Sequence, residues 1–206
     1  MLTASKNIYP RVLKSLIEKL AKLPGLGERS STRIVFYLLS RPELCEELSF
    51  LISELPKKVK LCKKCRNLSE DELCSICLDN SRNRRLLCIV ESPVTLYAIE
   101  SLSLFNGTYF VLHYLLSPRE GITPHDLPLE ELKGLIEENE VEEVILALSP
   151  TLSGNATAEF LKEFLSPLKL KLSRLALGIP YGLEIQFVDP LTLRKSLTDR
   201  EVLKNG

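Results

Sequence analysis

The amino-acid sequence predicts a multidomain α/β protein. A helical N-terminal region and a small cysteine-rich knuckle precede a mostly parallel sheet with flanking helices and a C-terminal extension. Three observations predict this class. Apolar residues recur at helical spacing in the first quarter of the chain, four cysteines follow as two close pairs, and from Arg84 short apolar runs alternate with amphipathic stretches. Strands that alternate with helices are typical of a parallel sheet covered on both faces.

The composition is that of a soluble globular protein. Of 206 residues, 45% are hydrophobic and 26% are charged. No apolar run approaches the roughly 20 residues that cross a bilayer. Residues 1–14 lack the charged and apolar regions of a signal peptide. We therefore expect a cytoplasmic protein with no membrane partner.

The net charge of zero conceals an asymmetry along the chain. Residues 1–66 hold 14 Lys and Arg against 6 Asp and Glu, whereas residues 67–206 hold 13 against 21. The basic end is suited to a polyanion and the acidic end to a different, basic partner. The alternative is that the charge only keeps two surfaces soluble.

The chain opens with two helical stretches joined by a glycine-containing turn. The first is expected over residues 8–23, and the second contains the stripe 34, 35, 38 and 39. The segment between them reads L-P-G-L-G (residues 23–27), so the region resembles a helix-hairpin-helix element. A further helix is expected over residues 42–55.

This hairpin carries the predicted DNA-binding site. Gly25 and Gly27 allow a tight turn and expose N–H groups at the start of the second helix, where the helix dipole favours a phosphate. Arg29 and Arg33 lie on one face of that helix, and Lys22 precedes the turn. Contacts of this kind bind DNA without reading its sequence. The alternative is a plain αα-hairpin.

A lysine-rich segment at residues 57–64 leads into a four-cysteine array. The lysines either extend the phosphate-binding surface or form a solvated face. Cys62, Cys65, Cys74 and Cys77 have the spacing C-x2-C-x8-C-x2-C. Two such pairs present the thiolates that tetrahedral Zn²⁺ requires. Disulfides and a redox CxxC are the alternatives, but a reducing cytosol favours the metal. Because four sulfurs leave no open position, we predict one structural zinc per chain.

The other cysteines and the two histidines are expected to be structural. Cys45 falls in a helical stretch and Cys88 in an apolar strand, so both are expected to be small buried hydrophobes. His113 and His125 lie far from the cysteines in sequence, which favours a structural or surface role for each.

The remaining chain predicts strands at residues 86–90, 108–116, 144–148 and 171–176. Helices are expected at 94–102, 127–139 and 155–165. In parallel sheets, function gathers beyond the carboxyl ends of the strands. Those ends offer Glu91 and the segment 149–154.

The order and spacing of these pieces resemble the bacterial recombination mediator RecR family. The likeness covers nearly the whole chain. It rests on L-P-G-L-G (23–27), the cysteine array, C-I-V-E-S-P (88–93), L-S-P-R-E-G-I-T-P (116–124), V-I-L-A (144–147), G-N-A-T-A (154–158) and R-L-A-L-G-I-P-Y-G (174–182).

The resemblance implies a Toprim fold for the α/β unit and four regions: a helix-hairpin-helix region at 1–56, a zinc finger at 57–82, a Toprim domain at 83–176 and a C-terminal region at 177–206. It also implies a ring-shaped homotetramer able to encircle DNA at the nucleoid. The partners implied are RecO and often RecF, which help to load recombinase onto single-stranded DNA.

Two departures from related sequences bear on function. Catalytic Toprim enzymes hold Mg²⁺ with a Glu and an Asp-x-Asp pair. Glu91 fills the first place, but Ser-Pro-Thr (149–151) follows the next buried strand. We therefore predict a non-enzymatic DNA-binding clamp in recombinational repair. A catalytic Toprim enzyme (nuclease, primase or topoisomerase) is the alternative. A repair glycosylase or nuclease would need an Asp or Lys just after the hairpin, where residues 28–30 offer none.

The second departure concerns partner binding. The family usually has E-G-E before A-T-A, where this chain has Ser153-Gly154-Asn155, and the later pattern G-G-D-L-E appears as G-L-E-I-Q (182–186). The surface around E-G-E is associated with RecO in relatives. Glu91, Ser153 and Asn155 are thus the candidate partner-binding residues, and RecO engagement is expected to be altered.

Overall fold

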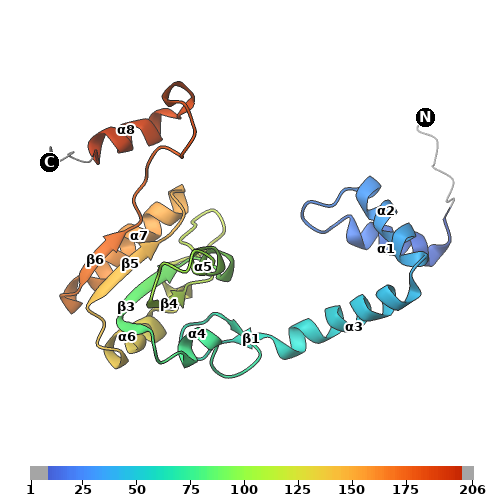
Figure 1. Cartoon of the computed structure of the whole chain (residues 1–206), viewed down its shortest axis with the longest axis horizontal. Coiled ribbons are helices and arrows are strands. Elements are labelled where there is room, and N and C mark those ends of the chain that lie inside the picture. Colours follow the sequence, from blue (N-terminus) through green and yellow to red (C-terminus); the bar gives the residue numbers. More distant parts are fainter. Residues whose placement is uncertain (1–8, 201–206) are drawn as a thin grey trace. The chain divides into compact units, whose positions relative to one another are not determined.

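The computed structural model describes residues 9–200, and the chain divides into two compact units, Met1–Lys58 and Val59–Gly206 (Figure 1). The start of the first predicted stripe, Ile8, lies outside the described residues. Among the residues described, no helix is both long and apolar enough to span a bilayer.

The N-terminal unit contains α1 (Arg11–Leu20), α2 (Glu28–Leu39) and α3 (Pro42–Lys58). Helix α1 begins after Pro10, which has the extended backbone of an N-cap residue. Ile17 of α1 and Val35 of α2 are buried and form the small core of this unit. The apolar stripe of α1 is only partly covered, since Val12 is 82% exposed. Helix α3 has no buried residue.

The turn between α1 and α2 depends on glycine. Gly25 has a φ of +78°, a left-handed conformation that residues with a Cβ atom rarely adopt. The Leu26 N–H donates to the Leu23 carbonyl at 3.1 Å, which closes the turn. Gly27 is extended and serves as the N-cap of α2.

The second unit begins with the cysteine-rich knuckle. Strands β1 (Lys60–Leu61) and β2 (Leu68–Ser69) pair in antiparallel fashion, and the short helix α4 (Ser75–Leu78) follows. The knuckle carries two cysteines between β1 and β2 and two at α4, as the array predicts.

A four-stranded parallel sheet is the centre of this unit. Its strands are β3 (Asn83–Val90), β4 (Gly107–Val111), β5 (Glu143–Ala147) and β6 (Lys171–Arg174), in the spatial order β4-β3-β5-β6. The predicted strand at 108–116 ends early, at Val111. His113 has a φ of +66°, so the chain leaves the extended conformation there.

Helices and the knuckle cover the two faces of the sheet (Figure 1). Alternate residues of β3 point to opposite faces, as the period of a strand requires. Leu87 and Ile89 pack with α6 (Leu129–Glu138) and α7 (Leu152–Leu165), whereas Cys88 and Val90 pack with α5 (Pro93–Glu100) and the cysteine knuckle. Helix α8 (Pro190–Thr198) follows the sheet. The predicted fold class is confirmed.

Candidate zinc centre and nucleic-acid interface

The four cysteines of the array converge on one point. Their sulfur atoms all lie within 4.8 Å of one another. The Sγ atoms of Cys62 and Cys77 are 3.7 Å apart, and those of Cys65 and Cys74 are 3.5 Å apart. A tetrahedron with Zn–S bonds of about 2.3 Å has edges of about 3.8 Å. Disulfide sulfurs would lie about 2.05 Å apart. The geometry therefore fits one Zn²⁺ ion.

The backbone of the knuckle orients these sulfurs. The Cys74 N–H donates to the Cys62 sulfur at 3.3 Å, an interaction that stabilises a thiolate. The Cys62 N–H donates to the Asn67 carbonyl at 2.7 Å, and Arg66 turns the chain with a φ of +63°. With all four positions taken by sulfur, such a zinc supplies folding energy and has no open place for a substrate.

The knuckle is bonded to the sheet beside it. The Val111 N–H, at the end of β4, donates to the Cys65 carbonyl at 2.9 Å. Cys62, Cys65 and Cys74 are buried in the same apolar cluster as Val111. Ion pairs add to this contact: Lys64–Glu138 at 2.7 Å and Arg66–Glu131 at 3.1 Å both reach α6.

The two remaining cysteines differ from each other. Cys88 is buried in β3, and burial raises the pKa of its thiol to about 12, so it stays protonated and inert. The expectation that Cys45 is buried is wrong, because it lies exposed on α3, a helix in which no residue is buried. The histidines are structural or exposed: His113 bonds to the backbone of the knuckle, and His125 lies at the surface.

The five predicted DNA-binding residues gather at the hairpin turn and the first two turns of α2. Lys22, Gly25, Gly27, Arg29 and Arg33 are all exposed. Helix α2 has no side-chain cap at its N-terminus. Its first internal bond is donated by the Ser31 N–H to the Gly27 carbonyl, at 2.9 Å. The amides before residue 31 therefore resemble those that bind anions at helix N-termini.

The lysine-rich segment is largely neutralised by carboxylates. Lys57 and Lys58 pair with Glu54, at 3.0 Å and 3.4 Å, and Lys63 pairs with Glu72. Together with the Lys64–Glu138 pair, these contacts favour the solvated-face alternative for much of this segment. In the described part of the N-terminal unit, six cations lie outside these ion pairs: Arg11, Lys19, Lys22, Arg29, Arg33 and Arg41. Three of them, Lys22, Arg29 and Arg33, lie at the hairpin turn and on α2.

The carboxyl edge of the sheet brings Glu91 to Ser149. Both carboxylate oxygens of Glu91 accept hydrogen bonds: one from the Ser149 N–H at 3.0 Å, the other from its hydroxyl at 2.5 Å. The pairing of Val90 with Ala147 in adjacent parallel strands causes this meeting. Glu91 thus serves as an acceptor for the loop before α7, an arrangement unlike an open metal site.

The other two candidate partner-binding residues lie at the start of α7. Ser153 is half-buried and Asn155 is exposed. The Asn155 side-chain oxygen accepts a hydrogen bond from the Arg174 guanidinium at 2.7 Å. No described contact brings Glu91 to Ser153 or Asn155, so partner binding at these three residues stays a prediction.

Sequence reasoning missed a contact between Tyr37 of α2 and Arg41, which follows the helix. The Arg41 guanidinium lies over the Tyr37 ring, with its central carbon 3.9 Å from the ring centroid. The spacing of four residues from Arg29 through Arg33 and Tyr37 to Arg41 is the signal that marks this row.

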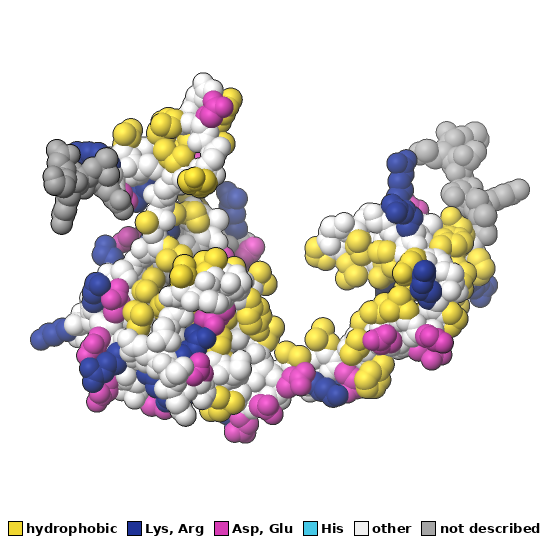
Figure 2. All heavy atoms as spheres, viewed as in Figure 1, with side chains coloured by type: hydrophobic (Ala, Val, Ile, Leu, Met, Phe, Trp, Pro, Cys, Tyr) yellow, Lys and Arg dark blue, Asp and Glu magenta, His cyan; other side chains and the backbone are white. Residues whose placement is uncertain are grey.

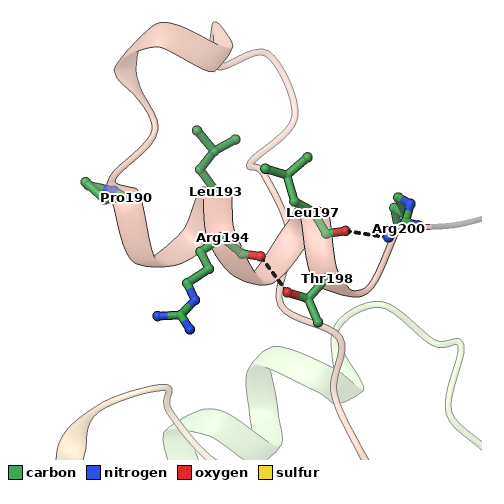
Figure 3. Close-up of a pocket in the computed structure, with 6 residues that line it drawn as sticks. All are labelled: Pro190, Leu193, Arg194, Leu197, Thr198 and Arg200. Carbon is green, nitrogen blue, oxygen red and sulfur yellow. Dashed lines mark hydrogen bonds between the residues drawn. The ribbon is translucent and has the colours of Figure 1, made fainter.

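A hollow at the C-terminal helix does not form a small-molecule site. It measures about 600 Å³, and its described lining comes from α8 and the residues just after it (Figure 3). The lining residues are Pro190, Leu193, Arg194, Leu197, Thr198 and Arg200. One side of a single helix gives no converging polar groups, which a ligand pocket needs.

A four-cysteine zinc centre, a helical hairpin and a Toprim-like parallel sheet define the protein as a zinc-finger protein of the Toprim class. Family models match each part: the Toprim domain at residues 85–176, the RecR helix-hairpin-helix at 13–52 and the RecR four-cysteine zinc finger domain at 59–79.

Curated relatives give the particular family. The recombination protein RecR of Myxococcus xanthus is 43% identical over 195 residues, which cover 94% of this chain and 99% of that protein. Those of Acidobacterium capsulatum and Pelotomaculum thermopropionicum are each 41% identical, over 95% and 96% of this chain and 98% and 100% of their own lengths. The chain belongs to the RecR family, and its four cysteines are those of a structural zinc site.

Proposed function

We propose that this chain is a non-enzymatic DNA-binding clamp that acts in recombinational repair at the nucleoid. The observation that carries the proposal is the N-terminus of α2, where uncapped amides follow the glycine turn and exposed arginines project from the same helix. The relatives named recombination protein RecR support the repair role.

The chemistry of the hairpin suits a phosphate backbone. The amides at the start of α2 bind one phosphate, and Arg29 and Arg33 bind its neighbours through charge. Glu28 lies in the first turn, where a carboxylate stabilises the helix dipole but also repels a phosphate. Its presence makes each hairpin a weak anchor, and no group in this set reads a base edge. Binding is therefore independent of sequence.

A weak anchor gains strength when several copies act together, because linked sites raise the effective concentration of one another. We propose a ring-like homo-oligomer, and the family resemblance gives the number four. Exposed apolar side chains on α3 support self-association: Phe50, Leu51, Ile52 and Leu55 are 53–69% exposed, and Figure 2 shows hydrophobic atoms over the N-terminal helices. RecO and RecF are the proposed protein partners. Light scattering with and without DNA, at two salt concentrations, tests the assembly, and a monomer under every condition would contradict it.

The proposal that the chain has no catalytic activity rests on the carboxyl edge of the sheet. Hydrolysis of a phosphodiester needs metal ions held by several converging carboxylates. Glu91 is the one carboxylate at the end of β3, and both of its oxygens are engaged by Ser149. No observation favours the catalytic alternative.

The DNA site is tested by Arg29→Ala, measured on duplexes of several sequences over a range of salt concentrations. The variant should weaken binding to every sequence alike, and the slope of log K against log[salt] should fall by roughly one unit, as expected for one lost phosphate contact. Lys14→Ala is the matched control, because Lys14 is an exposed cation of the same unit that already pairs with Glu18. Equal effects of the two variants would place the DNA site elsewhere.

A further inference from the structure

A row of three side chains runs along α2 on the side opposite its buried face, and a fourth side chain, from Arg41, follows just after the helix. Arg29, Arg33 and Tyr37 recur every four residues along the helix, with a rise of about 6 Å at each step. Arg41 comes four residues later, after the last residue of α2, and its guanidinium lies over the Tyr37 ring. The buried residues Ser31 and Val35 mark the other side of the helix. The row therefore begins at the proposed phosphate site and continues along exposed surface to Arg41, just beyond the end of α2.

The middle of this row is an aromatic surface between cations. The Tyr37 side chain is 51% exposed, although the Arg41 guanidinium covers part of one ring face at 3.9 Å. A hollow of about 350 Å³ borders the ring, lined among the described residues by Ser30, Arg33, Ile34 and Tyr37. Apolar side chains and the guanidinium of Arg33 therefore line the same hollow.

The charges of the row are uncommitted within the described part of the chain. The ion pairs in the N-terminal unit join Lys14 to Glu18 and the two lysines at the end of α3 to Glu54. Arg29, Arg33 and Arg41 take part in none of them. An exposed aromatic ring flanked by guanidinium groups that no described carboxylate neutralises suits a nucleotide, because the ring stacks on a base while the cations bind phosphates.

We propose that Tyr37 is a stacking platform for an unpaired base, so that the α2 row binds single-stranded DNA more tightly than the phosphate site alone. The inference rests on the proposed DNA-binding function and adds a preference to it. Bases in a duplex are stacked on one another and cannot offer a face to Tyr37. A single strand leaves the hairpin amides, passes Arg33 and places a base on the ring, with Arg41 beyond it. Stacking does not distinguish among bases, so the preference is for strand type and not for sequence.

The experiment compares Tyr37→Leu with the wild-type full-length, zinc-loaded protein on oligothymidine, on a duplex, and on an abasic strand of the same length. Tyr37→Leu should weaken binding of oligothymidine roughly 5- to 150-fold, as expected for one lost base–aromatic stack. Binding of the duplex and the abasic strand should stay unchanged. Tyr37→Phe keeps the ring and should bind as the wild type does.

Phe36→Leu is the matched control, because it removes an exposed ring of the same helix that packs on Tyr9 and lies outside the hollow. It should leave oligothymidine binding unchanged. Equal losses on oligothymidine and the abasic strand in Tyr37→Leu would overturn the proposal, as would no loss at all. A change of oligomeric mass in Tyr37→Leu would also overturn it, by assigning the ring to contact with a second copy. The Arg29→Ala variant separates the two proposals. If Arg29→Ala binds every DNA as tightly as the wild type does, the proposed phosphate site is wrong. If Arg29→Ala weakens binding as expected and only Tyr37→Leu has no effect, the stacking alone is wrong.

Discussion

The Nε2 atom of His113 lies 2.6 Å from the backbone carbonyl oxygen of Arg66, and both residues have a left-handed backbone conformation. The ring nitrogen donates this hydrogen bond, since a carbonyl oxygen only accepts. The contact joins the zinc knuckle to the segment that follows β4. Together with the Val111–Cys65 bond, it makes the sheet depend on the knuckle.

Loss of zinc should therefore destabilise more than the knuckle itself. We expect one Zn²⁺ per chain by elemental analysis, and we expect Cys74→Ser to lose the metal. Because structural zinc contributes folding energy, about 10–16 kcal/mol in zinc-finger peptides at pH 7, the variant should unfold the knuckle and lower the thermal midpoint of the sheet. The measurement is thermal unfolding followed by circular dichroism.

Cys45→Ser is the control for this variant, since it removes an exposed thiol outside the cluster. It should keep full zinc content and the wild-type midpoint. A Cys74→Ser protein that retains stoichiometric zinc and melts as the wild type does would contradict the structural role of the site.

A second prediction concerns pH and the ion pair at the start of β3. The guanidinium of Arg82 donates two hydrogen bonds to the Glu100 carboxylate, at 2.6 Å and 2.8 Å. This contact holds the pKa of Glu100 below its ordinary value of 4.5. Because the folded-state pKa is the lower one, the stabilisation is complete above the ordinary value and is lost as the pH falls through the folded-state pKa. Glu100→Gln should destabilise the protein at pH 7 by about 1.5–3 kcal/mol, as expected for hydrogen bonds to a charged group.

Urea unfolding at a series of pH values tests this prediction. The difference in free energy of unfolding between the wild type and Glu100→Gln should be largest at neutral pH and should decrease on acidification. Glu140→Gln is the control, because that carboxylate is highly exposed and its pair with Arg85 is long, at 3.8 Å. A gap that is constant at every pH would show that the loss comes from packing and not from charge.

Two helical glycines should respond to alanine in opposite ways. A Cβ atom at Gly154 would lie 2.0 Å from the Ser149 carbonyl oxygen, so Gly154→Ala must displace the backbone at the start of α7. A Cβ atom at Gly134 of α6 would meet open space. There alanine should stabilise by about 0.5–1 kcal/mol through helix propensity. Chemical denaturation of the two variants measures the two changes in free energy of unfolding, a loss for Gly154→Ala and a gain for Gly134→Ala. A Gly154→Ala protein as stable as the wild type would rule out the close approach of residue 154 to the Ser149 carbonyl.

The last prediction is that the protein cleaves, relaxes and primes no DNA in the presence of Mg²⁺ or Mn²⁺. Instead, Glu91→Ala should cost roughly 1–3 kcal/mol of stability, because the Ser149 N–H and hydroxyl lose their acceptor. Activity assays on supercoiled and single-stranded DNA are run beside urea unfolding. A wild-type activity that disappears in Glu91→Ala would overturn the non-enzymatic proposal.

Much of this protein could be predicted from local sequence. The zinc ligands are close in the chain, so the spacing of Cys62, Cys65, Cys74 and Cys77 suffices to identify them. The order of helices and strands follows from the period of the apolar residues, and L-P-G-L-G marks the turn before α2.

Only the tertiary structure decided how distant residues meet. Glu91 and Ser149 are 58 residues apart, and the parallel pairing of β3 with β5 brings them together. The bond from His113 to Arg66, 47 residues away, explains why β4 ends before the apolar run does. Burial also depends on packing partners. Cys88 and Cys45 both follow apolar patterns, but only Cys88, which packs against the knuckle, is buried. Periodicity states which residues share a face, whereas the contacts of that face depend on elements that are remote in the chain.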